Sequence, residues 1–217
     1  MFALVLAPLL AAVPARSFVA DVRAGKAVYA TFETTEGSFV CRLLSKEAPD
    51  AVAAFVGYAD GETPWKDTRS PTVLHGPIYD GTWFYRAVPD FAIQGGDPFD
   101  TGLIPPGYPF DDPVKAGGTF DAKGALATVA TGPHPYGSEF FVSDAPLPWL
   151  DGRYTVFGQV VAGMDVVDRI AHVPVGIFNR PLTPVVLKHV TLSLEPPKPP
   201  SGRTRETAIG SPCAQPH

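Results

Sequence analysis

Cysteine and histidine are scarce in this chain of 217 residues, and the few present are far apart. The two cysteines, Cys41 and Cys213, are too few for a disulfide framework or for the roughly four ligands of a structural zinc site. The five histidines show neither H-x-x-H nor H-E-x-x-H spacing. The sequence therefore gives little support to metal catalysis, and we expect no cofactor.

Positive charge and the common nucleotide-binding and hydrolase motifs are also lacking. The net charge is −5, so there is no basic excess to neutralise phosphates, and we expect no nucleic-acid partner. Neither G-x-S-x-G nor G-x-x-x-x-G-K-[ST] nor G-x-G-x-x-G occurs. The adjacent acids Asp111 and Asp112 are interpreted as part of a solvated loop, since neighbouring loop residues rarely converge on one bond.

Proline and glycine, in contrast, are abundant. The chain has 25 prolines, roughly twice the usual share, and 21 glycines. Both residues interrupt long helices, so an all-helical bundle is excluded in practice. With 45% hydrophobic and 18% charged residues the chain is globular, and its length suits one domain of ordinary size. The composition favours a loop-rich β protein.

The first fifteen residues are apolar and carry no charged side chain. They are too few to span a bilayer as a helix, so we expect no stable membrane insertion. The run suits a signal peptide, with cleavage after Ala15. This predicts an exported protein, periplasmic or secreted, and a mature chain that starts near Arg16. No Lys or Arg precedes the run, so a buried first strand or a membrane-associated stub stays open, and the protein is cytoplasmic if the run is not a signal.

The other end of the chain has a strong bias of its own. From Glu195 there are six prolines in 23 residues and almost no apolar periodicity. Such a segment cannot bury enough surface to offset its ordering entropy, so we predict a folded domain over residues 20–195 and a disordered tail over 196–217. Cys213 lies in this tail, and a bridge to Cys41 is left open.

Strand patterns dominate the middle of the chain. Apolar and polar residues alternate over 28–33 and again over 39–43, with a turn signal between, which predicts a hairpin with Cys41 on its apolar face. Further strands are expected at Thr82–Val88, Tyr154–Val161 and Val185–Leu194. Residues 62–77 are expected to form a loop, and 97–125 a long ordered functional loop.

Two helices interrupt the strands. One begins at Pro49, carries an apolar stripe, and ends at Asp60-Gly61. A second, shorter helix is expected between Gly163 and Ala171. About eight short strands with only two helices favour a closed antiparallel barrel, or a sandwich.

Several motifs rich in aromatic residues remain to be explained. Their order and spacing resemble the cyclophilin family of peptidyl-prolyl cis/trans isomerases, and the likeness runs from about residue 27 to 194. The motifs that carry it are Phe84-Tyr85-Arg86 with Phe91 and Gln94-Gly95-Gly96-Asp97, Gly137-Ser138-Glu139-Phe140-Phe141, and Trp149-Leu150-Asp151-Gly152 with Phe157-Gly158.

The resemblance implies a mainly β fold, a closed eight-stranded antiparallel barrel capped by two helices. It also implies a site in which Arg86 and Gln94 are catalytic, Arg86 as a donor to the prolyl nitrogen. Phe91, Phe141 and Leu150 would wall a proline pocket with Trp149 at its rim. The other substrate-binding positions that it implies are Ala92, Val129, Ala130, Glu139 and Tyr154.

The expected chemistry needs no bond to be made or broken. Rotation about an X-Pro bond crosses a barrier of about 18–20 kcal/mol because amide resonance is lost. The prolyl nitrogen gains lone-pair character in the twisted state, so a fixed donor aimed at it acts only in the transition state. Without the motif, Arg86 would be interpreted as a surface charge and the phenylalanines as core, as Phe140 still is.

The sequence departs from the family pattern inside the expected site. Tyr85 stands where the family often has His, and Ala92 where it often has Met. Val129-Ala130 replaces a common Ala-Asn pair, and Glu139 replaces Gln. We expect the Glu139 carboxylate to lie near Arg86, to draw the guanidinium away from the prolyl nitrogen, and so to restrain activity.

Two functions from different classes follow. The first is a monomeric prolyl isomerase that acts on proline-containing polypeptides, aids their folding and binds cyclosporin. The second is a cyclophilin-like module that binds proline peptides with little or no catalysis. A carbohydrate-binding β-barrel is a more distant alternative, since its aromatic residues would lie on an open face without the Arg-Gln pair.

Overall fold

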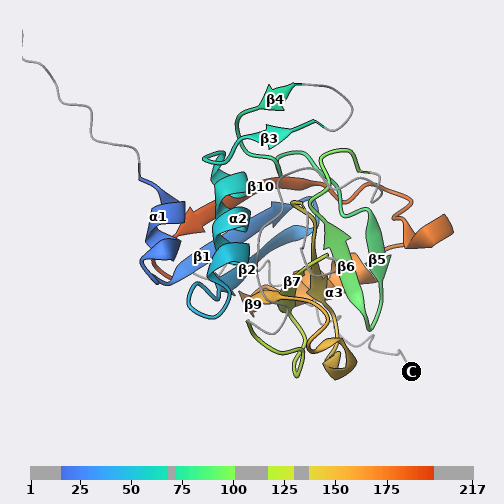
Figure 1. Cartoon of the computed structure of the whole chain (residues 1–217). Helices are drawn as coiled ribbons and strands as arrows, with labels where there is room; N and C mark the ends of the chain where they lie inside the picture. The colour runs from blue at the N-terminus through green and yellow to red at the C-terminus, as the bar shows by residue number, and fades with distance from the viewer. Residues whose placement is uncertain (1–15, 68–71, 101–116, 130–136, 198–217) are drawn as a thin grey trace, which may run out of the picture.

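A computed structural model describes residues 16–67, 72–100, 117–129 and 137–197 (Figure 1). The signal-peptide prediction for residues 1–15, the tail after 197, Cys213, Ala130 and the Asp111-Asp112 pair lie outside the described residues. Among those described, no helix is long and apolar enough to cross a membrane.

The main body is one antiparallel sheet of eight strands in the order β10-β1-β2-β9-β7-β8-β6-β5. This confirms the mainly β class and the strand number expected for the sheet. Two short strands, β3 and β4, pair separately within the predicted loop 62–77. The strands are β1 (Val28–Thr34), β2 (Gly37–Leu43), β3 (Trp65–Lys66), β4 (Val73–Leu74), β5 (Arg86–Val88), β6 (Ala92–Gly95), β7 (Ala125–Thr128), β8 (Phe140–Ser143), β9 (Val156–Ala162) and β10 (Leu187–Ser193).

The predicted hairpin is β1–β2. Phe32 faces Phe39 across the strands, and their rings stack with centroids 4.6 Å apart. The turn requires a positive φ of 123° at Gly37, which glycine adopts without a steric penalty. Cys41 is fully buried, as its alternation predicted, and burial raises the pKa of its thiol.

The sheet curls but is not fully closed. Its edge strands β10 and β5 are not paired as strands, because β5 begins only at Arg86 and not at Thr82 as predicted. The segment before β5 nevertheless bonds to the segment entering β10: the Phe84 N–H donates to the Val185 carbonyl at 2.9 Å. The prediction of a closed barrel is therefore slightly too strong, although the sheet has the expected eight strands.

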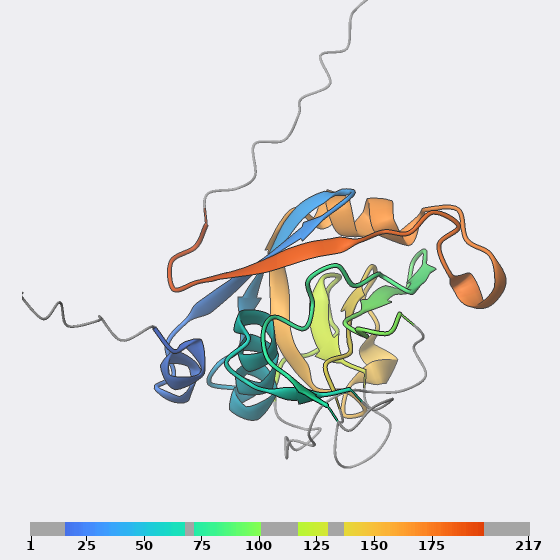
Figure 2. The same ribbon diagram turned by 90° about the horizontal axis from the view of Figure 1, so that it is seen from above.

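Both predicted helices are present, and the buried residues of both belong to the same apolar core inside the curled sheet (Figures 1 and 2). The first is α2 (Pro49–Asp60), which ends at Gly61 with a φ of 75°. A Cβ at Gly61 would lie 2.7 Å from the Cα of Gly76, so this close approach needs glycine. The second is α3 (Met164–Ala171), which starts after Gly163 in the left-handed region.

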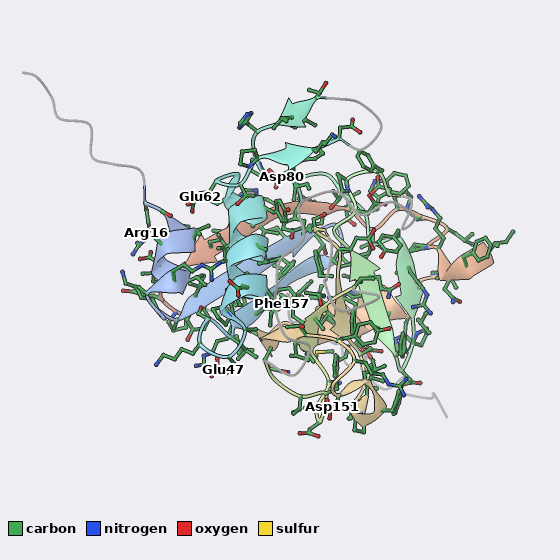
Figure 3. All side chains as sticks on the ribbon, in the orientation of Figure 1. Arg16, Glu47, Glu62, Asp80, Asp151 and Phe157 are labelled. Atoms are coloured by element: carbon green, nitrogen blue, oxygen red, sulfur yellow. The ribbon has the colours of Figure 1, made fainter. Side chains whose placement is uncertain are left out.

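A short helix, α1 (Phe18–Arg23), was not predicted. The Ser17 hydroxyl caps it by accepting the Ala20 N–H at 3.1 Å. Glu62, just beyond α2, accepts the Phe18 N–H at 2.6 Å and holds the helix against α2 (Figure 3). The folded part of the chain therefore extends to the residues that follow the apolar run.

The two faces of the sheet carry two separate apolar clusters. The larger one fills the interior, where Phe55 of α2 packs among the rings of Phe32, Tyr79, Phe140 and Phe157. Phe140 is thus core, as predicted. The second cluster lies on the other face and consists of Ala92, Phe120, Ala125, Ala127, Phe141, Leu147, Leu150 and Val156.

Candidate active site

A row of side chains crosses four strands on the face that carries the second apolar cluster. Arg86 of β5 is in register with Gln94 of β6, which is in register with Phe141 of β8, and Phe141 with Ala127 of β7. Cross-strand partners project to the same face of a sheet, at Cβ separations of about 5 Å. The structure therefore brings Arg86, Gln94 and Phe141 together, as the motifs predicted.

The tight turn between β5 and β6 places Phe91 under Arg86. Asp90 has a φ of 54°, and the Phe91 N–H donates to the Val88 carbonyl at 3.2 Å. The Arg86 guanidinium carbon lies 5.4 Å from the centroid of the Phe91 ring, a cation–π contact. Among the described residues, no carboxylate lies within ion-pair distance of this guanidinium, so its N–H donors remain available.

Phe141 is held between two other aromatic rings. It stacks on Phe120 with centroids 5.6 Å apart and planes 1° apart, and Tyr154 meets it edge-on at 5.4 Å. Phe120 was missed because it lies in a glycine-rich segment without periodicity. Its backbone N–H donates to Oδ1 of Asp151 at 2.8 Å, which fixes the segment against the W-L-D-G turn.

That turn supplies the other predicted side chains. The 3-10 helix Pro148–Leu150 turns Leu150 inward, where it is 8% exposed, and leaves Trp149 60% exposed. Leu150 joins the second apolar cluster, and the outward-facing Trp149 lies beside it in sequence. Leu150, predicted in the wall of the proline pocket, is therefore buried, and Trp149, predicted at its rim, is exposed.

The remaining predicted positions are small or at the edge of the described structure. Ala92 is fully buried in the second cluster, and Val129 packs against it half-buried. The Val129 N–H donates to the Glu139 carbonyl at 3.1 Å, which continues the β7–β8 pairing. Ala130 lies outside the described residues.

Glu139 does not contact Arg86, and that expectation was wrong. Its Oε2 accepts a hydrogen bond from the hydroxyl of Tyr85 at 3.2 Å, while its buried Oε1 has no hydrogen-bond partner within the described part of the chain. Burial, and then the charge of Asp97, raise the pKa of Glu139 to about 7. Tyr85 is partly buried, and this burial, followed by the charge of Glu139, raises the pKa of its hydroxyl as well. The carboxyl group therefore pairs with the hydroxyl of Tyr85, in a partly buried hydrogen bond, and not with Arg86.

Potential metal ligands lie apart from this row. Within the described ranges, three such side chains gather in one place: Asp144, Asp168 and His172. Asp144 directly follows β8, Asp168 lies in the last turn of α3 and His172 caps that helix, and none of them belongs to the Arg86 row. The Arg86 row itself offers a guanidinium, an amide and aromatic rings. The aromatic rings can pack against an apolar ring of a ligand, and the guanidinium and the amide can donate hydrogen bonds to it.

A comparison with family models decides which family has this arrangement. The model of the cyclophilin type peptidyl-prolyl cis-trans isomerases matches residues 29–192. The chain belongs to this family. Its cyclophilin domain covers the whole sheet except the start of β1 and the end of β10.

Curated relatives agree with this assignment. The cyclophilin is 39% identical to peptidyl-prolyl cis-trans isomerase B of Streptomyces anulatus, over 76% of this chain and 96% of the relative. It is 41% identical to peptidyl-prolyl cis-trans isomerase ppi1 of Schizosaccharomyces pombe, over 74% of this chain and 96% of the relative. Each relative is thus covered almost completely.

Solved structures support the fold. A crystal structure of a cyclophilin type peptidyl-prolyl cis-trans isomerase from Cryptosporidium parvum matches with a TM-score of 0.66 and 23% identity, over 78% of this chain and 99% of that one. A second structure from that organism, determined in the presence of the dipeptide Ala-Pro, matches with a TM-score of 0.62 and 24% identity, over 76% and 98%. The cyclophilin fold of the chain is therefore shown both by sequence and by structure.

Proposed function

We propose that this cyclophilin is an active peptidyl-prolyl cis/trans isomerase, with Arg86 as the catalytic donor. The observation that carries the proposal is the register of Arg86 with Gln94 and Phe141 on one face of the sheet. The family assignment and the curated relatives support the same activity.

Arg86 acts on the proline nitrogen and not on a bond that breaks. Twisting the X-Pro amide removes resonance and leaves a lone pair on that nitrogen, which the guanidinium stabilises with an N–H. Because the planar amide lacks this lone pair, the hydrogen bond strengthens only in the transition state. Phe91 positions Arg86 by its cation–π contact, and Gln94, next to it in register, orients Arg86 or binds the substrate backbone.

The substrate proline packs against the accessible side of the second apolar cluster. Phe141, fixed between Phe120 and Tyr154, supplies a rigid ring, and Leu150 and Phe91 complete the apolar surface. The partners are proline-containing polypeptides. A crystal structure of a protein with a similar fold, determined in the presence of the dipeptide Ala-Pro, supports this choice of ligand.

An exchange assay tests the proposal directly. NMR exchange spectroscopy on a proline tetrapeptide measures both isomerisation and binding, against an uncatalysed exchange that takes tens to hundreds of seconds. We expect catalytic amounts of the protein to accelerate exchange. If the peptide binds but exchanges at the uncatalysed rate, the chain is a proline-peptide binding module and the proposal fails.

Three finer features belong to the same proposal. Trp149, exposed and without a described hydrogen-bond partner, offers its indole N–H to cyclosporin, while Ala92 and Val129 reduce the apolar contact around the ligand.

The protein acts as a monomer. It is exported after cleavage near Arg16, which mass spectrometry of the protein from its native host would reveal; an intact Met1 would contradict export.

A further inference from the structure

Three possible metal ligands lie close together, next to the turn that carries Phe91. Asp168 and His172 are four residues apart at the end of α3, so they share one face of the helix. Asp144 directly follows β8. One ligand atom from each of the three side chains lies within 4.8 Å of those of the other two.

Asp144 is the unusual member of this group. It is only 6% exposed, and its Oδ2 accepts the Asp90 N–H at 3.2 Å. Its Oδ1 is buried and has no hydrogen-bond partner among the residues that the structure describes. Among the described residues no ammonium or guanidinium lies within 4 Å of this carboxylate, although the charges of His172 and Lys123 act on it from further away. A buried oxygen without a partner is unfavourable, and a cation bound to it would remove that penalty.

We propose that Asp144, Asp168 and His172 bind a divalent transition-metal cation, for which Zn²⁺ is the best match. Zn²⁺ accepts imidazole and carboxylate ligands together and is often held by three protein ligands and one water. Ligand atoms about 2.0–2.2 Å from the ion lie at most about 4.4 Å apart, so small movements of the side chains complete the site. Asp168 and His172 are half exposed, which permits both the movement and the entry of the ion.

The surroundings of His172 suit a metal ligand. Its Nδ1 lies 2.8 Å from the carbonyl oxygen of Asp168, which can only accept a hydrogen bond. Nδ1 of the neutral ring therefore carries the proton and Nε2 the lone pair, the tautomer that a second hydrogen bond commonly fixes in metal sites. The position at the carboxyl end of α3 also favours a cation, since the helix dipole is negative there.

The site is connected to the substrate-binding face by two backbone hydrogen bonds. The Asp144 N–H donates to the Phe91 carbonyl at 2.8 Å, and the Asp90 N–H donates to the Asp144 carboxylate. A cation held by Asp144 thus fixes the turn on which Phe91 supports Arg86. The binding of the cation itself does not depend on the isomerase activity.

Calorimetric titration of the full chain with Zn²⁺ alone, after removal of metals by a chelator, tests the proposal. We expect one saturable site, weakened at least about tenfold by Asp144→Asn and by His172→Gln. His189→Gln is the matched control, since His189 is an exposed histidine 2.9 Å from a single carboxylate, that of Asp80. Its affinity should equal that of the wild type.

Thermal unfolding gives a second readout for variants that bind too weakly to titrate. Zn²⁺ should raise the Tm of the wild type and of His189→Gln, but not that of His172→Gln, whose exposed side chain is not needed for folding. An equal rise in His172→Gln, the absence of saturable binding to the wild type, or Mg²⁺ binding as tightly as Zn²⁺ would overturn the assignment.

Discussion

The buried Glu139 makes the stability of this protein depend on pH in a direction opposite to that of an ordinary paired carboxylate. Its pKa is about 7 in the fold, against 4.5 for a free glutamate. The folded state therefore holds a proton that the unfolded chain releases between these two values. Ionisation of Glu139 therefore destabilises the fold. This loss of stability is absent below about pH 4.5, grows as the pH rises, and is complete above about pH 7.

The size of the penalty follows from the two pKa values. Each unit of difference corresponds to about 1.4 kcal/mol, so ionised Glu139 lowers the free energy of unfolding by about 3 kcal/mol at pH 8. Glu139→Gln keeps the shape, and its amide oxygen can still accept the Tyr85 hydroxyl, but it cannot ionise. We expect this variant to be more stable than the wild type at pH 8, with the difference shrinking to below about 1 kcal/mol at pH 5.

Urea unfolding of both proteins at several pH values between 5 and 8.5 measures this difference. Glu47→Gln is the matched control, because Glu47 is exposed, and its stability should follow that of the wild type at every pH. Tyr85→Phe should extend the pH-dependent loss of stability to higher pH, because it removes the hydrogen bond that lowers the pKa of Glu139. A stability difference between Glu139→Gln and the wild type that does not change with pH would refute the reasoning.

Three further predictions concern other parts of the protein. Phe120→Ala should lower the free energy of unfolding by about 3–5 kcal/mol in urea titration, because it removes a buried ring stacked on Phe141; a loss below about 1 kcal/mol would contradict this packing. In a Cys213→Ser background, a thiol reagent should modify the buried Cys41 only as fast as the protein unfolds, and immediate reaction in native buffer would contradict its burial. Calorimetry should detect weak to moderate cyclosporin binding that Trp149→Phe reduces further, and no binding by the wild type, or affinity as tight as that of the best cyclophilins, would count against the proposed contact.

Sequence patterns correctly predicted those elements whose position depends on residues near each other in the chain. The alternation around Phe32 and Phe39 sets the hairpin register, and Pro49 and Gly61 delimit α2. Helix α1 could not be predicted in this way. It has six residues and depends on Glu62, which is more than forty positions away and becomes a neighbour only after α2 has formed.

The candidate site shows the same division. Motif order correctly placed Arg86 and Gln94 side by side because both lie in regular, paired strands. The partner of Glu139 could not be deduced, since Tyr85 and Arg86 are adjacent and either could reach the carboxylate; the structure gives it to Tyr85. Phe120 was missed because its position depends on a hydrogen bond to Asp151 and not on any periodic pattern.

The role of Arg86 is the central claim, and the kcat/KM of Arg86→Ala in the prolyl isomerisation assay tests it most directly. Arg42→Ala is the matched control, because it removes an exposed strand arginine of β2. With the fold confirmed by circular dichroism, we predict at least about a tenfold loss for Arg86→Ala, or about 1.4 kcal/mol of transition-state stabilisation, and no loss for Arg42→Ala. A folded Arg86→Ala protein with wild-type kcat/KM would contradict the account.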